Sequence, residues 1–460
     1  MLYILLKIIF KIALRVFFQR IEVRNQHLIP ATGPLLIAAN HPNTFMDPIA
    51  IAAVVKQEVF FIAKGTVFNS PLKRWLLHKM NLIPVYRRED GAVPAADNEA
   101  TFQKCTAFLQ QKGTLLIFPE GNSYNERRLR PLKTGTARIA LAAESQFNGE
   151  MNVQILPVGV NYTDPTRFRS KLFINIGAPI AVKDFIIPAD PDNFKVAQEL
   201  TGEISRRLTD LLIITESEEE DELVQQVERV YWADLRQDFN LQARQEDNFV
   251  LTKGIAESIR YFQKSEPERV QVLREKLNLY HQNLKRLGLQ DKYLAQSQSK
   301  PNIFEDSLKT IFYLIAGFPL FVWGLITNYL PYYIPGKIAD VLTDAEEFRA
   351  PVMMTAGIFT FGLTYALIIA VAYTGTNSVL LTLAILLSLP LSGFFVLRYS
   401  YRLRVTQTYI RLIAFLFERS PALSSLLQQR EEILRSLEEA KHIYLQHTGL
   451  IKGPAPLNEM

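Results

Sequence analysis

The chain has 460 residues, of which 48% are hydrophobic and 21% are charged, so it is too long for one core and predicts two or three units. Its only cysteine, Cys105, excludes an internal disulfide framework and argues against a cysteine-based metal site. The net charge of +5 favours anionic partners such as lipid head groups and phosphates. Because no nucleic-acid-binding signature occurs, nucleic acid is not expected as a partner.

Residues 1–20 are apolar but carry Lys7, Lys11 and Arg15 at intervals of four. This spacing puts the three cations on one helix face, and it leaves no uninterrupted run long enough for a membrane span. We therefore predict an amphipathic helix lying in the membrane interface. The alternative is an ordinary helix that packs on the first domain.

Residues 21–210 have the pattern of an α/β domain, in which short β-rich runs alternate with helical patterns. Such alternation predicts a sheet covered by helices. The predicted helices are 47–55, 97–111 and 133–143. The predicted strands are 35–39, 59–63, 82–86, 115–118, 154–160 and 172–176.

Residues 211–305 form a charged region with mostly helical periodicity. The acidic run Glu216–Glu222 within it is typical of a solvated linker or an exposed helix start.

A membrane region is predicted over residues 306–400. Two stretches without a charge, Val352–Tyr373 and Ser378–Leu397, are each long enough to cross the hydrocarbon core. They predict spans at about 352–374 and 378–398, which should form a transmembrane hairpin. A third apolar segment, 311–334, is long enough too, but Asn328 and several prolines interrupt it, so we interpret it as broken.

Arginines after the hairpin, at positions 398, 402 and 404, favour a cytoplasmic location for its end. An even number of crossings keeps the first domain on that side as well, so segment 311–334 is expected to be re-entrant, interfacial or not a span. The tail, residues 401–460, is predicted to be helical and cytoplasmic.

The strongest chemical motif is Asn40-His-Pro-Asn-Thr-Phe-Met-Asp47, which follows an apolar strand. Ligand and catalytic groups collect where strands end in α/β folds. His41 can act as a base near neutral pH, and a carboxylate on its other ring nitrogen would fix its tautomer. The alternative is that Asp47 caps the next helix.

Basic side chains and special backbone residues follow other strand ends. A loop of net charge +3 after Phe118-Pro-Glu-Gly121 suits a phosphate, although each arginine in it could equally be solvated or face the membrane. Pro157 interrupts a strand-like run and predicts an edge or a bulge. No histidines lie at metal-ligand spacing, so no metal is expected. The candidate substrate-binding residues are Arg87, Glu120, Gly121, Arg127, Arg128, Lys133 and Pro157.

Together, these motifs resemble the glycerolipid acyltransferase family, which includes lysophosphatidate and glycerol-3-phosphate acyltransferases. The family's blocks occur in order as Asn40–Asp47, Leu82–Arg87, Phe118–Gly121 and Leu156–Val158. Five residues separate His41 from Asp47, where the usual motif has four. This longer spacing resembles the fungal glycerol-3-phosphate/dihydroxyacetone-phosphate acyltransferases, and it favours glycerol 3-phosphate as the acceptor.

The resemblance implies an integral membrane enzyme with its catalytic domain on the cytoplasmic face. Acyl-CoA or acyl carrier protein would be the thioester donor, with a glycerol-phosphate acceptor and no cofactor. His41 would be the general base, oriented by Asp47, and Pro157 would lie on the donor side. Arg87 and the block around Glu120 would hold the acceptor. This chain has Ser123 near the position of the family's usual Arg, so Arg127 or Arg128 would replace it.

Two alternatives remain open at this stage. One is acylation of lysophosphatidate or another lysophospholipid. The other is a catalytically inactive membrane scaffold, against which the presence of both His41 and Asp47 argues.

Overall fold

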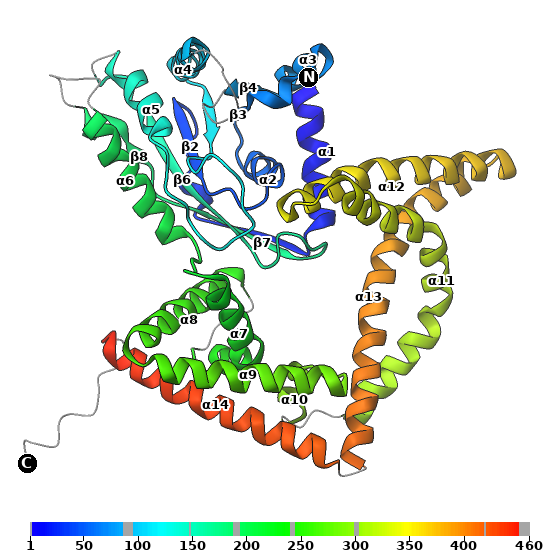
Figure 1. Cartoon of the computed structure of the whole chain (residues 1–460). Helices are drawn as coiled ribbons and strands as arrows, with labels where there is room; N and C mark the ends of the chain where they lie inside the picture. The colour runs from blue at the N-terminus through cyan, green and yellow to red at the C-terminus, as the bar shows by residue number, and fades with distance from the viewer. Residues whose placement is uncertain are drawn as a thin grey trace, which may run out of the picture. The chain divides into compact units, whose positions relative to one another are not determined.

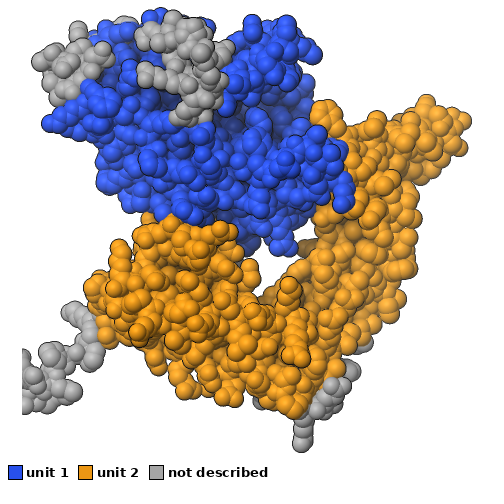
Figure 2. All heavy atoms as spheres, viewed as in Figure 1, with its two compact units in different colours: residues 1–214, 335–358 blue, residues 215–334, 359–460 orange. Residues whose placement is uncertain are grey.

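The computed structural model describes residues 2–85, 95–146, 149–186, 194–239, 244–298, 303–417 and 420–449. It divides into two compact units, which Figure 2 distinguishes by colour. Unit 1 comprises residues 1–214 and 335–358, and unit 2 comprises residues 215–334 and 359–460. The first boundary lies close to the predicted end of the α/β domain at residue 210.

A mixed sheet forms the centre of unit 1, with strand order β1-β7-β6-β2-β5-β3-β4 and the short β8 beside β6. All pairs are parallel except those of β6 with β7 and β8. The six predicted strands are confirmed, whereas β1 and β8 were not predicted. The strands are β1 Arg20–Arg24, β2 Leu35–Ala39, β3 Val59–Lys64, β4 Leu82–Val85, β5 Thr114–Ile117, β6 Gln154–Tyr162, β7 Lys171–Ile176 and β8 Ile180–Ala181.

Both faces of the sheet are covered by helices, as predicted (Figure 1). Strand β2 shows why, because its alternate apolar side chains enter two different cores. Leu35 and Ile37 join the core that contains α1 and α2, whereas Leu36 and Ala38 join the core that contains α4, α5 and α6. These helices are α1 Leu2–Phe17, α2 Met46–Val54, α3 Pro71–Lys79, α4 Ala95–Gln110, α5 Gly135–Ser145 and α6 Phe194–Leu211, with 3₁₀ turns η1 Gln26–Leu28, η2 Gly65–Phe68 and η4 Val182–Phe185.

Helix α1 is attached to unit 1 along its length. Leu14 and Phe17 are buried in the core at its C-terminal end. Near its N-terminal end, the Lys7 ammonium donates to the carbonyl oxygens of Val55 and Gln57 at 2.8 and 3.2 Å. The opposite face of α1 stays exposed. Helix α1 therefore packs on the domain with one face and leaves its other apolar face exposed. Its location in the membrane interface stays a prediction.

Pro157 contradicts the prediction of an edge or a bulge. It lies in the interior strand β6, in register with Ala38 of β2. The proline is tolerated because it falls where the neighbour of β6 changes from β8, paired at 154–155, to β7, paired from 158. The carbonyl of Pro157 faces that gap and accepts the Gly177 N–H at 2.9 Å. Its nitrogen faces the same gap, so no ladder hydrogen bond is lost.

Unit 2 contains a helical bundle whose helices come from two separate segments of the chain. The charged region and the C-terminal tail, predicted as separate segments, share one apolar core. The acidic run starts a helix, with the Ser217 hydroxyl accepting the Glu220 N–H at 3.1 Å as an N-cap. The bundle helices are α7 Glu218–Asp238, α8 Gln245–Ser265, α9 Pro267–Leu287, α10 Asp291–Gln298 and α14 Pro421–His447.

Three further helices, α11 Ile303–Leu342, α12 Glu346–Thr376 and α13 Val379–Phe417, are long and apolar enough to cross a membrane. The predicted break in 311–334 is not observed, because α11 is continuous. Pro335 removes the donor to the Pro331 carbonyl, and Thr360 of α12 supplies another by donating its hydroxyl at 3.1 Å. The number of crossings made by α11 stays a prediction.

A buried ion pair joins the two chain segments of the bundle, and it generates a stability prediction. Arg430 of α14 donates to Asp291 of α10 at 2.9 Å, and the Tyr280 hydroxyl donates to the same carboxylate at 2.6 Å. Arg430→Ala would leave a buried carboxylate without its cation, which costs about 3–5 kcal/mol. The matched control is Arg435→Ala, whose exposed pair with Glu431 contributes about 0–1 kcal/mol. Thermal unfolding of the purified protein in detergent measures both, and equal Tm shifts would contradict the prediction.

Candidate active site

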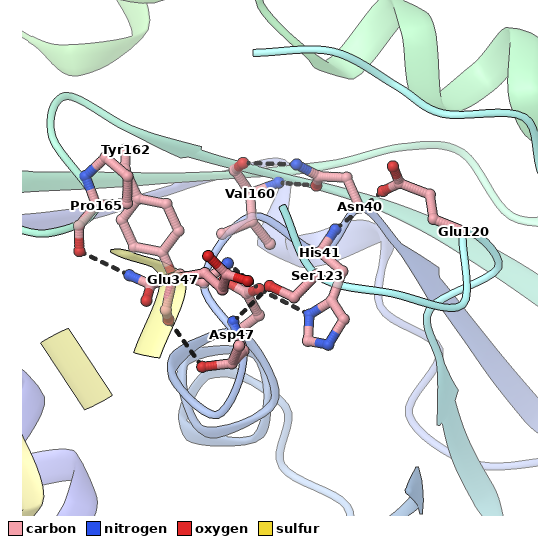
Figure 3. A network of polar contacts seen from close by, with 11 residues as sticks. Asn40, His41, Asp47, Glu120, Ser123, Val160, Tyr162, Pro165 and Glu347 are labelled. Atoms are coloured by element: carbon pink, nitrogen blue, oxygen red, sulfur yellow. Dashed lines mark hydrogen bonds and ion pairs between the residues drawn. The ribbon is translucent and has the colours of Figure 1, made fainter. Parts of the chain in front are cut away.

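The site begins where strand β2 ends. Asn40 continues the sheet through its side chain, which accepts the Val160 N–H at 2.7 Å and donates to the Val160 carbonyl at 3.0 Å. This amide takes the place of a backbone pair and fixes the chain direction at the start of the motif (Figure 3). The next residue, His41, is thereby held at the C-terminal end of β2, where catalytic groups gather in α/β folds.

The predicted hydrogen bond between His41 and Asp47 is present. His41 Nδ1 and Asp47 Oδ2 are 2.9 Å apart, with 18% of the His41 side chain exposed and none of Asp47. The His41 ring also stacks on Phe118, with ring centroids 3.8 Å apart. Because an ionised Asp47 only accepts, His41 carries its proton on Nδ1 and keeps the Nε2 lone pair for a reacting group. The geometry is that of a general base, and the catalytic role itself stays a prediction.

Three donors surround the buried Asp47 carboxylate. Besides His41, the Asn43 N–H donates to Oδ2 at 2.7 Å and the Tyr162 hydroxyl donates to Oδ1 at 2.7 Å. Burial and the adjacent Asp47 charge raise the pKa of Tyr162 well above its usual value, so this phenol stays a donor. Asp47 lies in the first turn of α2 but accepts from these groups and does not serve as its N-cap, which is Phe45.

A strained turn brings His41 and Asp47 together across five intervening residues. Thr44 has φ of +29°, which a β-branched residue adopts only when its surroundings enforce it. Its N–H donates to the Ser123 hydroxyl at 2.9 Å, and its own hydroxyl donates to the Glu347 carbonyl at 2.9 Å. The turn is therefore held from two sides by segments distant in sequence.

The first turn of α12 forms one of those sides. The Asn125 amide donates to the Glu346 carboxylate at 3.0 Å, and the rings of Phe45 and Phe348 meet edge to face. Ala350 and Met354, one and two turns further on, are buried in the same core as α2. A candidate membrane helix thus starts against the His41–Asp47 turn, inside unit 1.

Glu120 fastens the second loop to the first. One carboxylate oxygen accepts the His41 N–H and the other accepts the Arg130 N–H, each at 3.0 Å. Burial raises the pKa of Glu120, and those two backbone N–H groups oppose the shift by favouring the charged form. The structure therefore gives Glu120 a bracing position behind His41, and direct contact with substrate stays a prediction.

Gly121 and Lys133 lie together beside this brace. Gly121 has φ of +85°, a backbone conformation that favours glycine. A Cβ added there would lie 3.1 Å from Cε and 3.2 Å from the ammonium of Lys133, so the lysine side chain lies against this turn. This arrangement puts a cation next to the loop that contacts His41.

The arginines of the same loop differ in their contacts. Nη2 of Arg130 donates to both carboxylate oxygens of Glu126, at 3.0 and 3.1 Å, and Arg128 forms a longer ion pair with the same carboxylate at 3.6 Å. The Arg130 guanidinium also lies 3.7 Å from the centre of the Tyr124 ring. The Glu126 carboxylate partly neutralises the charge of Arg128. Arg127 is half-buried. Their contact with an acceptor phosphate stays a prediction.

Two other candidate residues stand apart from this cluster. Pro157 is buried within the sheet, so a role on the donor side would act through the shape of β6. Arg87 lies outside the described residues, after β4 ends at Val85.

Comparison with known proteins assigns the domain. Residues 20–161 match the family model described as "Acyltransferase". The chain is 23% identical over 413 residues to glycerol-3-phosphate O-acyltransferase 1 of Saccharomyces cerevisiae, covering 70% of this chain and 53% of the relative. It is 40% identical over 86 residues to glycerol-3-phosphate O-acyltransferase 2 of that yeast, covering 19% and 11%. Residues 20–161 therefore form an acyltransferase-family domain, and the chain is similar to glycerolipid acyltransferases.

A further relative has a different acceptor in its name. The 1-acyl-sn-glycerol-3-phosphate acyltransferase alpha of Mus musculus is 26% identical over 128 residues, covering 27% of this chain and 42% of the relative. The chain spans about half the length of the first curated relatives that it matches.

Several residues of the acyltransferase domain site were not predicted from the sequence. Tyr162 lies 115 residues from Asp47 and approaches it only because β6 lies beside β2. Thr44 and Phe118 were within recognised motifs, but nothing in their identity indicated a left-handed turn or a stacked ring. Glu347 contributes a backbone carbonyl, which no sequence pattern marks.

Tyr162 generates a prediction about the His41–Asp47 pair. Tyr162→Phe keeps the ring and removes one donor from Asp47, so we expect kcat of the acyl transfer to fall about 10-fold, equivalent to about 1.4 kcal/mol. A kcat equal to that of the wild type would refute this. Tyr401→Phe, which removes an exposed phenol, is the matched control.

Proposed function

We propose that this protein transfers an acyl group from a thioester donor, acyl-CoA or acyl carrier protein, to a hydroxyl of a glycerol-phosphate acceptor in glycerolipid synthesis. The observation that supports it best is the hydrogen-bonded His41–Asp47 pair at the end of β2, within the domain that matches the acyltransferase family. We further propose an integral membrane protein with its catalytic domain on the cytoplasmic face, without a metal or cofactor.

In the proposed reaction, His41 Nε2 takes the proton of the acceptor hydroxyl. The resulting oxygen nucleophile attacks the thioester carbonyl, forming a C–O bond as the C–S bond breaks. Protonated His41 then returns the proton to the departing thiolate. Asp47 keeps the ring oriented and stabilises the imidazolium while it exists. Electrons and protons balance without a covalent acyl-enzyme.

Lys133 and the neighbouring arginines supply positive charge for an acceptor phosphate. The Gly121 turn keeps the Lys133 ammonium beside the loop that Glu120 ties to His41. A phosphate held there would place its glycerol hydroxyl toward His41, which suits a compact acceptor. This reasoning, together with the two yeast relatives, favours glycerol 3-phosphate over lysophosphatidate.

Substitution of His41 tests the proposed base. His41→Ala should lower kcat/KM by about 10²–10⁴-fold, the usual contribution of a positioned general base. The control is His27→Ala, an exposed histidine in η1. Activity is measured with purified protein in detergent or nanodiscs, and thermal unfolding verifies that both variants fold. Wild-type rates from folded His41→Ala protein would exclude the mechanism.

The acceptor is tested by direct competition. With one acyl-CoA donor, kcat/KM should be higher for glycerol 3-phosphate than for dihydroxyacetone phosphate or lysophosphatidate. A preference for lysophosphatidate would replace the proposed acceptor but retain acyl transfer. No turnover of any acceptor by well-folded wild-type protein, with either type of donor, would favour the inactive scaffold instead.

A further inference from the structure

Helix α3 has an arrangement of side chains that is opposite to that of an ordinary surface helix. Leu72, Trp75 and Leu76 share one face at i, i+3 and i+4, and they are 73%, 58% and 40% exposed. No residue of α3 is fully buried. A soluble domain normally turns such a face inward.

The other side of α3 makes the contacts with the domain. Leu77 is its one partly buried residue, and the His78 ring lies 5.5 Å from the Phe68 ring. Leu77 lies opposite the face formed by Leu72 and Leu76, whereas His78, three residues after Trp75, lies at the edge of that face. The helix starts at a defined N-cap, where the Ser70 hydroxyl accepts the Lys73 N–H at 3.2 Å. The apolar face is therefore presented outward by a helix that is fixed at its base.

The sequence that forms α3 and the strands on either side of it is basic. From residue 59 to residue 86 the chain has four cations and no carboxylate, which gives a net charge of +4. Three of the cations, Lys73, Arg74 and Lys79, belong to α3 and are exposed. Apolar side chains, a tryptophan and flanking cations are what an anionic bilayer surface attracts.

Helix α1, which also exposes apolar side chains, lies near α3. The Asn81 amide, just after α3, donates to Glu58 at 2.8 Å, and the next residue, Val59, donates its N–H to the Tyr3 hydroxyl of α1 at 3.1 Å. Figure 1 shows the start of α1 next to α3. Ile4, Leu5 and Ile8 of α1 are all more than half exposed, so α1 also presents apolar side chains outward.

The bilayer is within reach of this surface, because unit 1 contains the start of a candidate membrane helix. Ala350 and Met354 of α12 are buried in the same core as Leu14 and Phe17, at the far end of α1. Helix α1 thus connects the beginning of α12 to the side of the domain that carries α3.

We propose that α3 is a lipid-binding element that inserts Leu72, Trp75 and Leu76 into the interface of an anionic bilayer beside α1. The side chains enter the boundary between head groups and acyl chains, while Lys73, Arg74 and Lys79 contact lipid phosphates. This surface does not depend on the proposed acyl transfer, because it requires neither His41 nor an acceptor.

The three tryptophans of the chain allow a direct test in the full-length protein. Trp232→Phe with Trp323→Phe leaves Trp75 as the only tryptophan. The positive control is the variant whose only tryptophan is Trp323, on candidate membrane helix α11. The negative control is the variant whose only tryptophan is Trp232, which packs against the core of the helical bundle. Each variant is reconstituted into nanodiscs of phosphatidylglycerol and phosphatidylcholine brominated near the head-group end of its chains.

We expect bromolipid to quench Trp75 at least half as strongly as Trp323 and clearly more than Trp232. Adding Leu72→Ser and Leu76→Ser to the Trp75 variant should lower the quenching, as should replacing phosphatidylglycerol with neutral lipid. Quenching of Trp75 no greater than that of Trp232 would overturn the proposal. If Trp75 is also shielded from aqueous iodide in that case, a protein surface or a second copy covers it instead.

Discussion

The site depends on keeping one carboxylate charged without water. Asp47 is fully buried, and an isolated charge there would be protonated or would destabilise the fold. Donors from three places stabilise it: the His41 ring, the Asn43 backbone and the Tyr162 hydroxyl. Each donor requires a different feature of the fold, namely the end of β2, the tight turn after it and the pairing of β6 with β2. The surrounding structure can be understood as the means of bringing these donors to Asp47.

The turn between His41 and Asp47 connects this charge to the membrane region. Its five intervening residues are accommodated by a left-handed Thr44, and a strained conformation persists only where contacts determine it. One contact comes from Ser123 in the loop braced by Glu120, and the other from Glu347 at the start of α12. The geometry of His41 is therefore determined jointly by the loop that contains Glu120 and Ser123 and by the first turn of a candidate membrane helix.

Patterns that repeat locally were predictable from the sequence. Short β-rich runs that alternate with helical patterns predicted the strands, and the order of motifs predicted the candidate base and its carboxylate. The predictions that were wrong concerned residues whose contacts lie elsewhere in the chain. Pro157 predicted an edge because proline has no N–H to donate to a sheet. The sequence does not show that the strand next to β6 changes from β8 to β7 at this residue. Pro335 similarly suggested a break in α11, although Thr360 supplies a donor to the carbonyl that this proline leaves unpaired.

Tyr162 and Glu347 show a second limit. Neither belongs to a motif, and each reaches the site through pairing or packing with residues more than 100 positions away. Only the strand order and the packing of α12 against α2 bring them there. Local patterns thus identify the groups that can do chemistry, whereas the groups that hold them follow from the tertiary structure.

The same energetics bear on whether the domain is a catalyst or an inactive scaffold. A scaffold needs a stable fold, and an apolar residue in place of Asp47 would avoid the cost of burying a charge. The chain instead retains the carboxylate, a tyrosine whose hydroxyl is committed to it and a Thr44 turn in an unfavourable conformation. These costs are offset by function if a histidine must be oriented with Nε2 available to a substrate. The arrangement around Asp47 is thus better explained by catalysis than by structural support.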